Sequence, residues 1–287
     1  MAERITFWYG CNVLRHGDII HACIEILRLL GFDVQPAGGP DYCCGTAKDA
    51  NQAAADGMAR RTVTRFNDLG RDQVIAWCPS CHSHMSDFMS QAYPADFALG
   101  YFVDLLYEHR SALSALLQRP VPMRVLLHRH VGFNDRVQVD AKVTALLKLI
   151  PGIEVLEDAY AAPGYMCALL AAVPAAMEDM VRQTLASAKA QRADALVTAF
   201  HRCYRELCGL EAEGALAVFN YVQLLARSIG LDFADEYKDW KKSGRNAAAA
   251  IGEARLAQVG VQFFERAMLP ELAQRPPGIG PKKQRQL

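Results

Sequence analysis

The segment VIAWCPSC, residues Val74–Cys81, has a counterpart in LVTAFHRC, residues Leu196–Cys203. Both begin with a short apolar run that is typical of a buried strand. Two further pairs of segments match in the same order, with an offset of about 120 residues. They are Ile26–Val34 with Leu147–Val155, and Phe102–Leu106 with Tyr221–Leu225. We therefore favour an internal duplication over chance similarity between two units of the same type.

Strand and helix signals alternate along each half of the sequence. In the first half we expect strands at Ile5–Tyr9, Phe32–Val34 and Gln73–Trp77, and helices at residues 18–30 and 47–69. In the second half we expect strands at Arg124–Leu127, Ile153–Val155 and Ala195–Thr198, and helices at residues 142–149 and 173–190. The segment Pro36–Pro40 predicts a loop, because its prolines and glycines interrupt regular structure.

This alternation predicts an α/β fold with two duplicated lobes, each built on a small, mostly parallel sheet flanked by helices. A helical C-terminal extension follows the two lobes. We place the N-terminal domain at residues 1–120, its C-terminal counterpart at 121–240 and the extension at 241–287. From Leu269 onward we expect a poorly packed, flexible tail, because four of the 13 prolines lie there.

The composition excludes several classes of protein. Of the 287 residues, 52% are hydrophobic and 22% are charged, which is the balance of a chain that buries a full core. Lys and Arg total 31, as do Asp and Glu, so no net positive charge favours nucleic acid or an anionic membrane. The longest nearly apolar run, Tyr165–Met177, is shorter than the roughly 20 residues of a membrane span. The start of the chain lacks the features of a secretory signal, and we expect a cytoplasmic protein.

The nine cysteines carry most of the functional information. Five of them form the pattern C-x31-C-C-x33-C-x2-C in the first half: Cys11, Cys43, Cys44, Cys78 and Cys81. They follow three predicted strands, and loops at the carboxyl ends of parallel strands gather on one side of a sheet. We therefore expect one shared site. In a reducing compartment, such a group is more typical of metal binding or redox chemistry than of disulfides.

Three kinds of chemistry are open to this group. Crowded thiols can lose their protons to hold a metal. A structural zinc takes four ligands, which five thiolates exceed, whereas an iron–sulfur cluster offers several irons. A dithiol redox pair at Cys78 and Cys81 would leave the other three cysteines unexplained. We favour a cluster over zinc and over a dithiol.

The complete pattern, with Gly45 after the paired cysteines, resembles the CCG cysteine-rich domain. The duplicated chain, to about residue 240, is similar to the B subunit of heterodisulfide reductases. This resemblance implies a noncubane [4Fe-4S] cluster whose ligands here are Cys11, Cys43, Cys44, Cys78 and Cys81. It also implies a complex in which an iron–sulfur C subunit and a flavin-containing A subunit supply electrons. Because no G-x-G-x-x-G follows a predicted strand, any flavin belongs to a partner.

The second half departs from this pattern. Its corresponding positions fall near Val131, Met166, Cys167, Phe200 and Cys203. Three of these side chains cannot supply thiolates, so we expect one cluster per chain. Several polar side chains remain there: His128, His130, His201, Cys167, Cys203 and Cys208. They could hold zinc or another metal, but we favour a role in packing.

Two functions are compatible with the sequence. The resemblance implies an oxidoreductase subunit that exchanges electrons between a partner subunit and a thiol, disulfide or persulfide substrate, as in a sulfur-oxidation complex. A second B-type subunit could then supply the missing cluster. The alternative is a scaffold or assembly subunit whose zinc or cluster is structural and separate from catalysis. His82 and His84 follow Cys81 directly, and either tune the cluster by hydrogen bonding or cap a helix.

Overall fold

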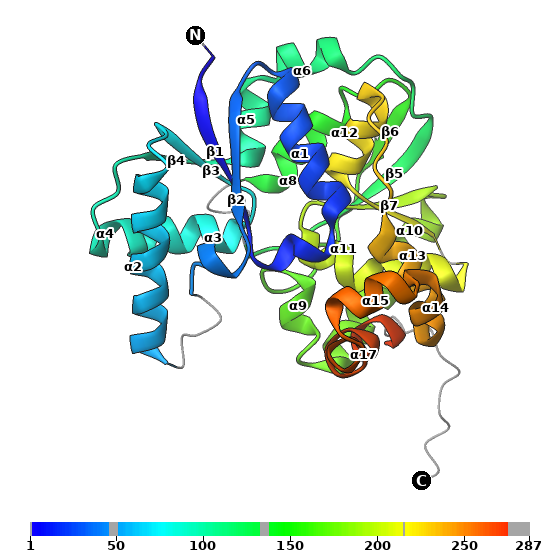
Figure 1. Ribbon diagram of the computed structural model, residues 1–287. Coiled ribbons are helices and arrows are strands. Elements are labelled where there is room, and N and C mark those ends of the chain that lie inside the picture. Colours follow the sequence, from blue (N-terminus) through cyan, green and yellow to red (C-terminus); the bar gives the residue numbers. More distant parts are fainter. Residues whose placement is uncertain (1, 46–50, 133–137, 215, 275–287) are drawn as a thin grey trace. The chain divides into compact units, whose positions relative to one another are not determined.

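The computed structural model describes residues 2–45, 51–132, 138–214 and 216–274 (Figure 1). Their strands form two four-stranded sheets in which neighbouring strands run parallel. The first sheet has the order β2 (Asp33–Gly38), β1 (Arg4–Gly10), β3 (Gln73–Ala76) and β4 (Ala98–Tyr101). The second has the order β6 (Ile153–Leu156), β5 (Met123–His128), β7 (Ala195–Thr198) and β8 (Ala217–Asn220). The α/β prediction is confirmed, and both sheets have the same strand order within their half.

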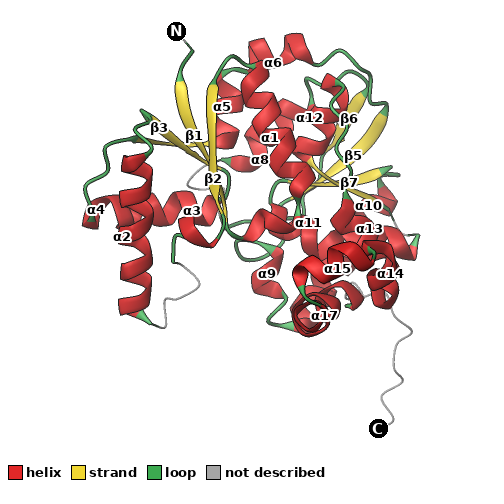
Figure 2. Cartoon of the chain, viewed as in Figure 1, coloured by secondary structure: helices red, strands yellow, loops and turns green. Residues whose placement is uncertain are grey.

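Helices flank both sheets (Figure 2). Those of the first half are α1 (Gly17–Leu29), α2 (Gln52–Asp68), α3 (Pro79–His84), α4 (Ser90–Ala92), α5 (Phe102–Glu108) and α6 (Arg110–Leu116). Those of the second half are α8 (Val139–Leu147), α9 (Cys167–Leu170), α10 (Pro174–Ala190), α11 (His201–Leu207) and α12 (Tyr221–Ile229). Part of the helix expected at residues 47–69 lies outside the described residues.

Strand β1 shows why this sequence builds a sheet covered on both faces. Successive side chains of a strand point to opposite faces, and both Phe7 and Trp8 are fully buried. Phe7 packs against Phe102 of α5, with ring centroids 5.6 Å apart. Trp8 packs edge-on against Phe66 of α2 at 5.1 Å. Four consecutive residues of the strand, 5–8, are fully buried, so side chains on both faces of the sheet are covered, as in other parallel sheets.

The loop expected at Pro36–Pro40 is wrong in its first part, because Pro36 belongs to strand β2 and lies opposite Phe7 of β1. Proline lacks a backbone N–H and is tolerated in a strand at the edge of a sheet. Strand β2 is such an edge strand. The chain turns after it, at Gly39, whose N–H donates to the carbonyl oxygen of Gly10 at 2.8 Å.

The C-terminal extension is helical, as expected. It comprises α13 (Glu236–Ser243), α14 (Ala247–Ile251), α15 (Glu253–Val259), α16 (Val261–Phe263) and α17 (Leu269–Ala273). The expected looseness from Leu269 onward is wrong for α17, because Leu272 is buried and the Tyr237 hydroxyl donates to the Glu271 carboxylate at 2.6 Å. An apolar residue and a hydrogen-bonded carboxylate hold this turn in place. Residues 275–287 lie outside the described residues.

The chain divides into two compact units, and each draws on more than one stretch of sequence. The first comprises Met1–Val121, Ala141–Gly152 and Val222–Phe233, and the second comprises Pro122–Asp140, Ile153–Tyr221 and Ala234–Leu287. Most of α8 and α12 therefore packs in the first unit. Across the described residues, no helix combines the length and apolar character needed to cross a membrane.

Candidate metal centre

The five cysteines of the first half follow three neighbouring strands of the first sheet. Cys11 comes directly after β1, and Cys43 and Cys44 come after β2 by way of the short helix η2 (Pro40–Tyr42). Cys78 and Cys81 lie at the start of α3, just beyond β3. Because β2, β1 and β3 are adjacent and parallel, their carboxyl ends lie side by side.

Distances between side chains show that these cysteines meet. The Sγ atoms of Cys11 and Cys43 are 3.6 Å apart, and those of Cys44 and Cys81 are also 3.6 Å apart. Cys78 and Cys81 interact through their side chains. All nine cysteines lie in the described residues, and none forms a disulfide. The structure thus brings together every cysteine of the predicted site.

Backbone contacts hold the paired cysteines in place. The Thr62 hydroxyl on α2 donates to the carbonyl oxygen of Cys43 at 2.9 Å. The Trp8 indole N–H donates to the carbonyl oxygen of Tyr42 at 2.9 Å. Gly45 has a φ of +85°, and a Cβ there would lie 3.0 Å from the carbonyl oxygen of Ala55. A glycine after the two cysteines is therefore required by both backbone conformation and space.

The site has a buried side and an accessible side. Cys44, Cys78 and Cys81 are 2%, 9% and 4% exposed and belong to the apolar cluster beneath the sheet edge. Cys11 and Cys43 are only partly buried. A group held by all five would be anchored from within and reached from the side of Cys11 and Cys43.

Because the thiols are crowded together, their pKa values shift in opposite directions. The hydrogen bond from Cys81, with help from the backbone N–H groups of Ser80 and Cys81, outweighs burial and lowers the pKa of Cys78 to about 7. Hydrogen bonding to Cys44 instead raises the pKa of Cys81 well above its usual range. Hydrogen bonding to Cys43 likewise raises the pKa of Cys11. Several neighbouring thiolates would repel one another, and a bound metal removes this conflict because it stabilises all of them together.

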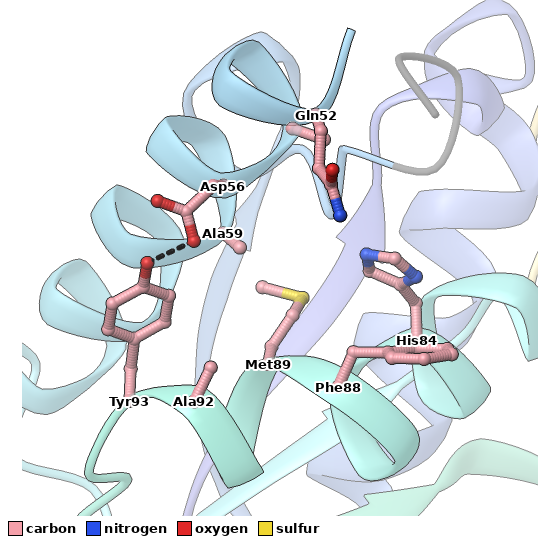
Figure 3. Close-up of a pocket in the computed structure, with 9 residues that line it drawn as sticks. Gln52, Asp56, Ala59, His84, Phe88, Met89, Ala92 and Tyr93 are labelled. Carbon is pink, nitrogen blue, oxygen red and sulfur yellow. Dashed lines mark hydrogen bonds between the residues drawn. The ribbon is translucent and has the colours of Figure 1, made fainter. Parts of the chain in front are cut away.

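A cavity of about 370 Å³ lies beside this site, between α2 and the segment that runs from His84 to Tyr93 (Figure 3). Its walls include Ala59 and Met89, which belong to the same buried cluster as Cys44 and Cys81. On one side of the cavity the Tyr93 hydroxyl donates to the Asp56 carboxylate (Figure 3). This cavity could not be predicted from the sequence, because its walls carry no motif and meet only in the fold.

The histidines after Cys81 lie in the last turn of α3. The His82 ring lies 5.4 Å from the Tyr101 ring, and the His84 ring lies 5.3 Å from the Phe88 ring. His84 lines the cavity (Figure 3). Cys23 is fully buried on α1, away from the five-cysteine pattern and in the core as expected.

The second half holds a different group at the corresponding strand ends. Four buried side chains, His128, His130, Cys167 and Cys203, have ligand atoms that all lie within 4.8 Å of one another. Burial opposes ionisation of Cys203, but hydrogen bonding from Cys167 and the charge of His130 outweigh it and hold its pKa well below the usual range. Cys208 lies outside this group, and its Sγ donates to the carbonyl oxygen of Arg205.

Comparisons with known proteins support part of this assignment. Residues 5–86 match the CCG cysteine-rich domain. The match covers all five cysteines of the first site. In the second half, the group of His128, His130, Cys167 and Cys203 is compatible with metal binding. No curated protein matches the chain.

Among solved structures, the chain is similar to PH1733, an aspartate racemase homologue from Pyrococcus horikoshii OT3. The identity is 12% and the TM-score 0.35, over 79% of this chain and 97% of that one. It is also similar to a putative Asp/Glu racemase from Yersinia pestis, with 11% identity and a TM-score of 0.34 over 79% of this chain and 98% of that one. Similarities at this level carry no information about chemistry.

Proposed function

We propose that this chain is an iron–sulfur oxidoreductase subunit that resembles the B subunit of heterodisulfide reductases. It exchanges electrons between a partner iron–sulfur or flavin subunit and a thiol, disulfide or persulfide substrate. The observation that supports this most strongly is the convergence of Cys11, Cys43, Cys44, Cys78 and Cys81 at one edge of the first sheet. These five residues would hold one noncubane [4Fe-4S] cluster.

The donor set fits such a group better than a single zinc ion. Five thiols exceed the four ligands of a structural zinc site. Thiolate ligands suit iron–sulfur clusters, in which several irons share the sulfur donors. The pKa of Cys78, already lowered to about 7, gives one ligand that ionises near neutral pH.

The five cysteines would have different roles, according to how deeply each one is buried. Cys44, Cys78 and Cys81 hold the group from the apolar interior, which excludes water from that side. Cys11 and Cys43, which are only partly buried, leave the opposite side accessible to solvent. When bound, the cluster supplies one-electron transfer. Cleavage of a disulfide consumes two electrons and two protons and yields two thiols, so the partner must deliver electrons in two steps.

The cavity beside the site is where we place the organic part of the substrate. Its volume of about 370 Å³ is within the range of small-molecule pockets. Ala55, Ala59 and Met89 provide apolar walls, and Gln52 and His84 provide polar groups (Figure 3). This mixture suits a thiol or disulfide with an apolar carbon chain and a polar end.

The partners follow from the same proposal. A C-like iron–sulfur subunit and an A-like flavin subunit would carry electrons, and a second B-type subunit would contribute the cluster that the second half of this chain lacks. The proposal places the protein in the cytoplasm, where reducing conditions keep thiols available as ligands.

The test compares Cys44→Ser with Cys23→Ser, which replaces an equally buried cysteine outside the site. We expect anaerobically purified wild type and Cys23→Ser to be brown and to bleach reversibly with a reductant, and Cys44→Ser to lose the colour. Colourless wild-type protein with zinc at the five cysteines would refute the proposal. A coloured protein that no reductant or substrate changes would instead favour the scaffold function, because a structural group need not exchange electrons.

A further inference from the structure

The second sheet carries its own constellation of ligand-type side chains at the carboxyl ends of its strands. His128 is the last residue of β5, and His130 lies just beyond it. Cys167 begins α9 after β6, and Cys203 lies in the first turn of α11 after β7. Separate stretches of sequence thus deliver two imidazoles and two thiols to one point.

The spacing of the four side chains is that of ligands around one ion. The Nε2 atoms of His128 and His130 are 3.1 Å apart, and the Sγ of Cys167 lies 3.2 Å from the first and 3.4 Å from the second. A tetrahedral zinc ion separates two nitrogen ligands by roughly 3.3 Å and a nitrogen from a sulfur by roughly 3.6 Å. The observed distances are only slightly shorter, so a small outward movement accommodates the ion.

The surroundings orient these side chains as ligands. The Nδ1 of His130 lies 3.2 Å from the carbonyl oxygen of Pro163, a contact that places the proton on Nδ1 and leaves the lone pair on Nε2. Metal-binding histidines usually donate their other N–H in this way. The backbone N–H of Cys167 donates to the Sγ of Cys203 at 3.4 Å, a contact that stabilises a thiolate. The backbone on both sides of His130 is fixed to Ala162 by two hydrogen bonds, of 2.9 and 3.1 Å.

Burial distinguishes a structural site from a catalytic one. His128, His130, Cys167 and Cys203 are 4%, 1%, 0% and 1% exposed. Structural zinc sites are closed by four protein ligands, whereas catalytic sites keep one position open to water or substrate. A fully enclosed set of four ligands leaves no such position.

From this geometry we infer that the second half of the chain binds one structural zinc ion through His128, His130, Cys167 and Cys203. The ligand set of two imidazoles and two thiolates suits zinc and is unsuited to calcium or magnesium, which prefer oxygen. Val131, Met166 and Phe200 occupy the other positions of the lost motif and supply no thiolate. The second half has therefore exchanged a five-cysteine site for a mononuclear one that ties together the ends of β5, β6 and β7.

The sequence alone favours packing for these residues, because six candidate polar side chains are spread over several segments. The fold selects four of them and leaves His201 and Cys208 outside the group. This zinc site does not depend on the proposed redox function, since the two sites share no residue.

The test measures zinc and iron in the purified full-length chain, with Cys203→Ser as the disrupting variant. Cys208→Ser is the matched control, because Cys208 is equally buried but lies outside the group. We expect about one zinc per chain in wild type, Cys208→Ser and Cys44→Ser, and at least a tenfold loss in Cys203→Ser. The iron content reports on the first site and the zinc content on the second. A failure of one proposal can therefore be distinguished from a failure of the other.

A measurement on wild type alone covers the case in which Cys203→Ser does not fold. X-ray absorption at the zinc edge should show two nitrogen ligands at about 2.0 Å and two sulfur ligands at about 2.3 Å. Zinc surrounded only by sulfur would place it among the five cysteines and overturn the inference. So would wild-type protein that binds no zinc after reconstitution, since the four side chains would then form a metal-free polar core.

Discussion

Replacing Gly45 by alanine should weaken both the fold and metal loading of the first site. The residue has a φ of +85°, and a left-handed backbone costs an alanine about 1–2 kcal/mol. The added Cβ would also lie 3.0 Å from the carbonyl oxygen of Ala55, a backbone atom that cannot rotate away. Overpacking of this kind adds about 1–3 kcal/mol. We expect a total destabilisation of about 2–5 kcal/mol.

Gly70→Ala is the matched control. Gly70 also has a positive φ, of +58°, but nothing lies within 4 Å of the position that a Cβ would occupy there. Gly70→Ala should therefore lose only about 1–2 kcal/mol of stability, which is the cost of a left-handed backbone for an alanine. At about 2–4 °C per kcal/mol, the two melting temperatures should differ by several degrees.

The assay is thermal unfolding of the metal-free proteins, followed by circular dichroism, together with the iron content of the proteins as purified. Gly45→Ala should melt lower than Gly70→Ala and hold less iron, because Cys44 is its neighbour in the chain. Equal melting temperatures and full iron loading in both variants would refute the argument that Gly45 positions the paired cysteines.

Three further changes test separate parts of the account. Ala92→Trp should fill the cavity and raise the KM for a thiol or disulfide substrate without changing the iron content. Its control is Ala53→Trp, on the exposed side of α2, which should change neither the KM nor the iron content. An unaltered KM in Ala92→Trp would exclude this cavity as the substrate site. Thr62→Val removes the hydrogen bond to the carbonyl oxygen of Cys43 and should lower stability by about 1 kcal/mol, measured by urea unfolding. Burial raises the pKa of Glu206, so its charged form opposes folding once the pH rises above the ordinary pKa of a glutamate. Glu206→Gln should therefore melt higher than wild type at pH 7, and this gain should vanish near pH 4; a gain that persists in acid would contradict the burial argument.

The first site could be predicted from the sequence because its cysteines directly follow strands whose ends meet at one edge of the sheet. Apolar runs such as Gln73–Trp77 lead directly into cysteines, and parallel strands bring their carboxyl ends to one edge whatever the details of packing. The same five cysteines lie within the family match to residues 5–86 and meet in the structure.

The remaining features depend on tertiary context. Pro36 signals a loop locally, but its place on an edge strand allows it to stay in β2. Strand β4, ALGY, is short and contains a glycine, so its pairing with β3 rather than any intrinsic preference defines it. The grouping of His130 with Cys203 joins residues far apart in sequence, and only the strand order shows which polar side chains meet.

The central claim is that five thiols from three strand ends hold a multi-iron cofactor. Its most direct test is the content of iron and acid-labile sulfide in anaerobically purified protein, with an electron paramagnetic resonance spectrum before and after reduction. We expect about four irons and four sulfides per chain and a signal that changes with reduction. Protein that lacks labile sulfide after anaerobic reconstitution with iron and sulfide would contradict the claim.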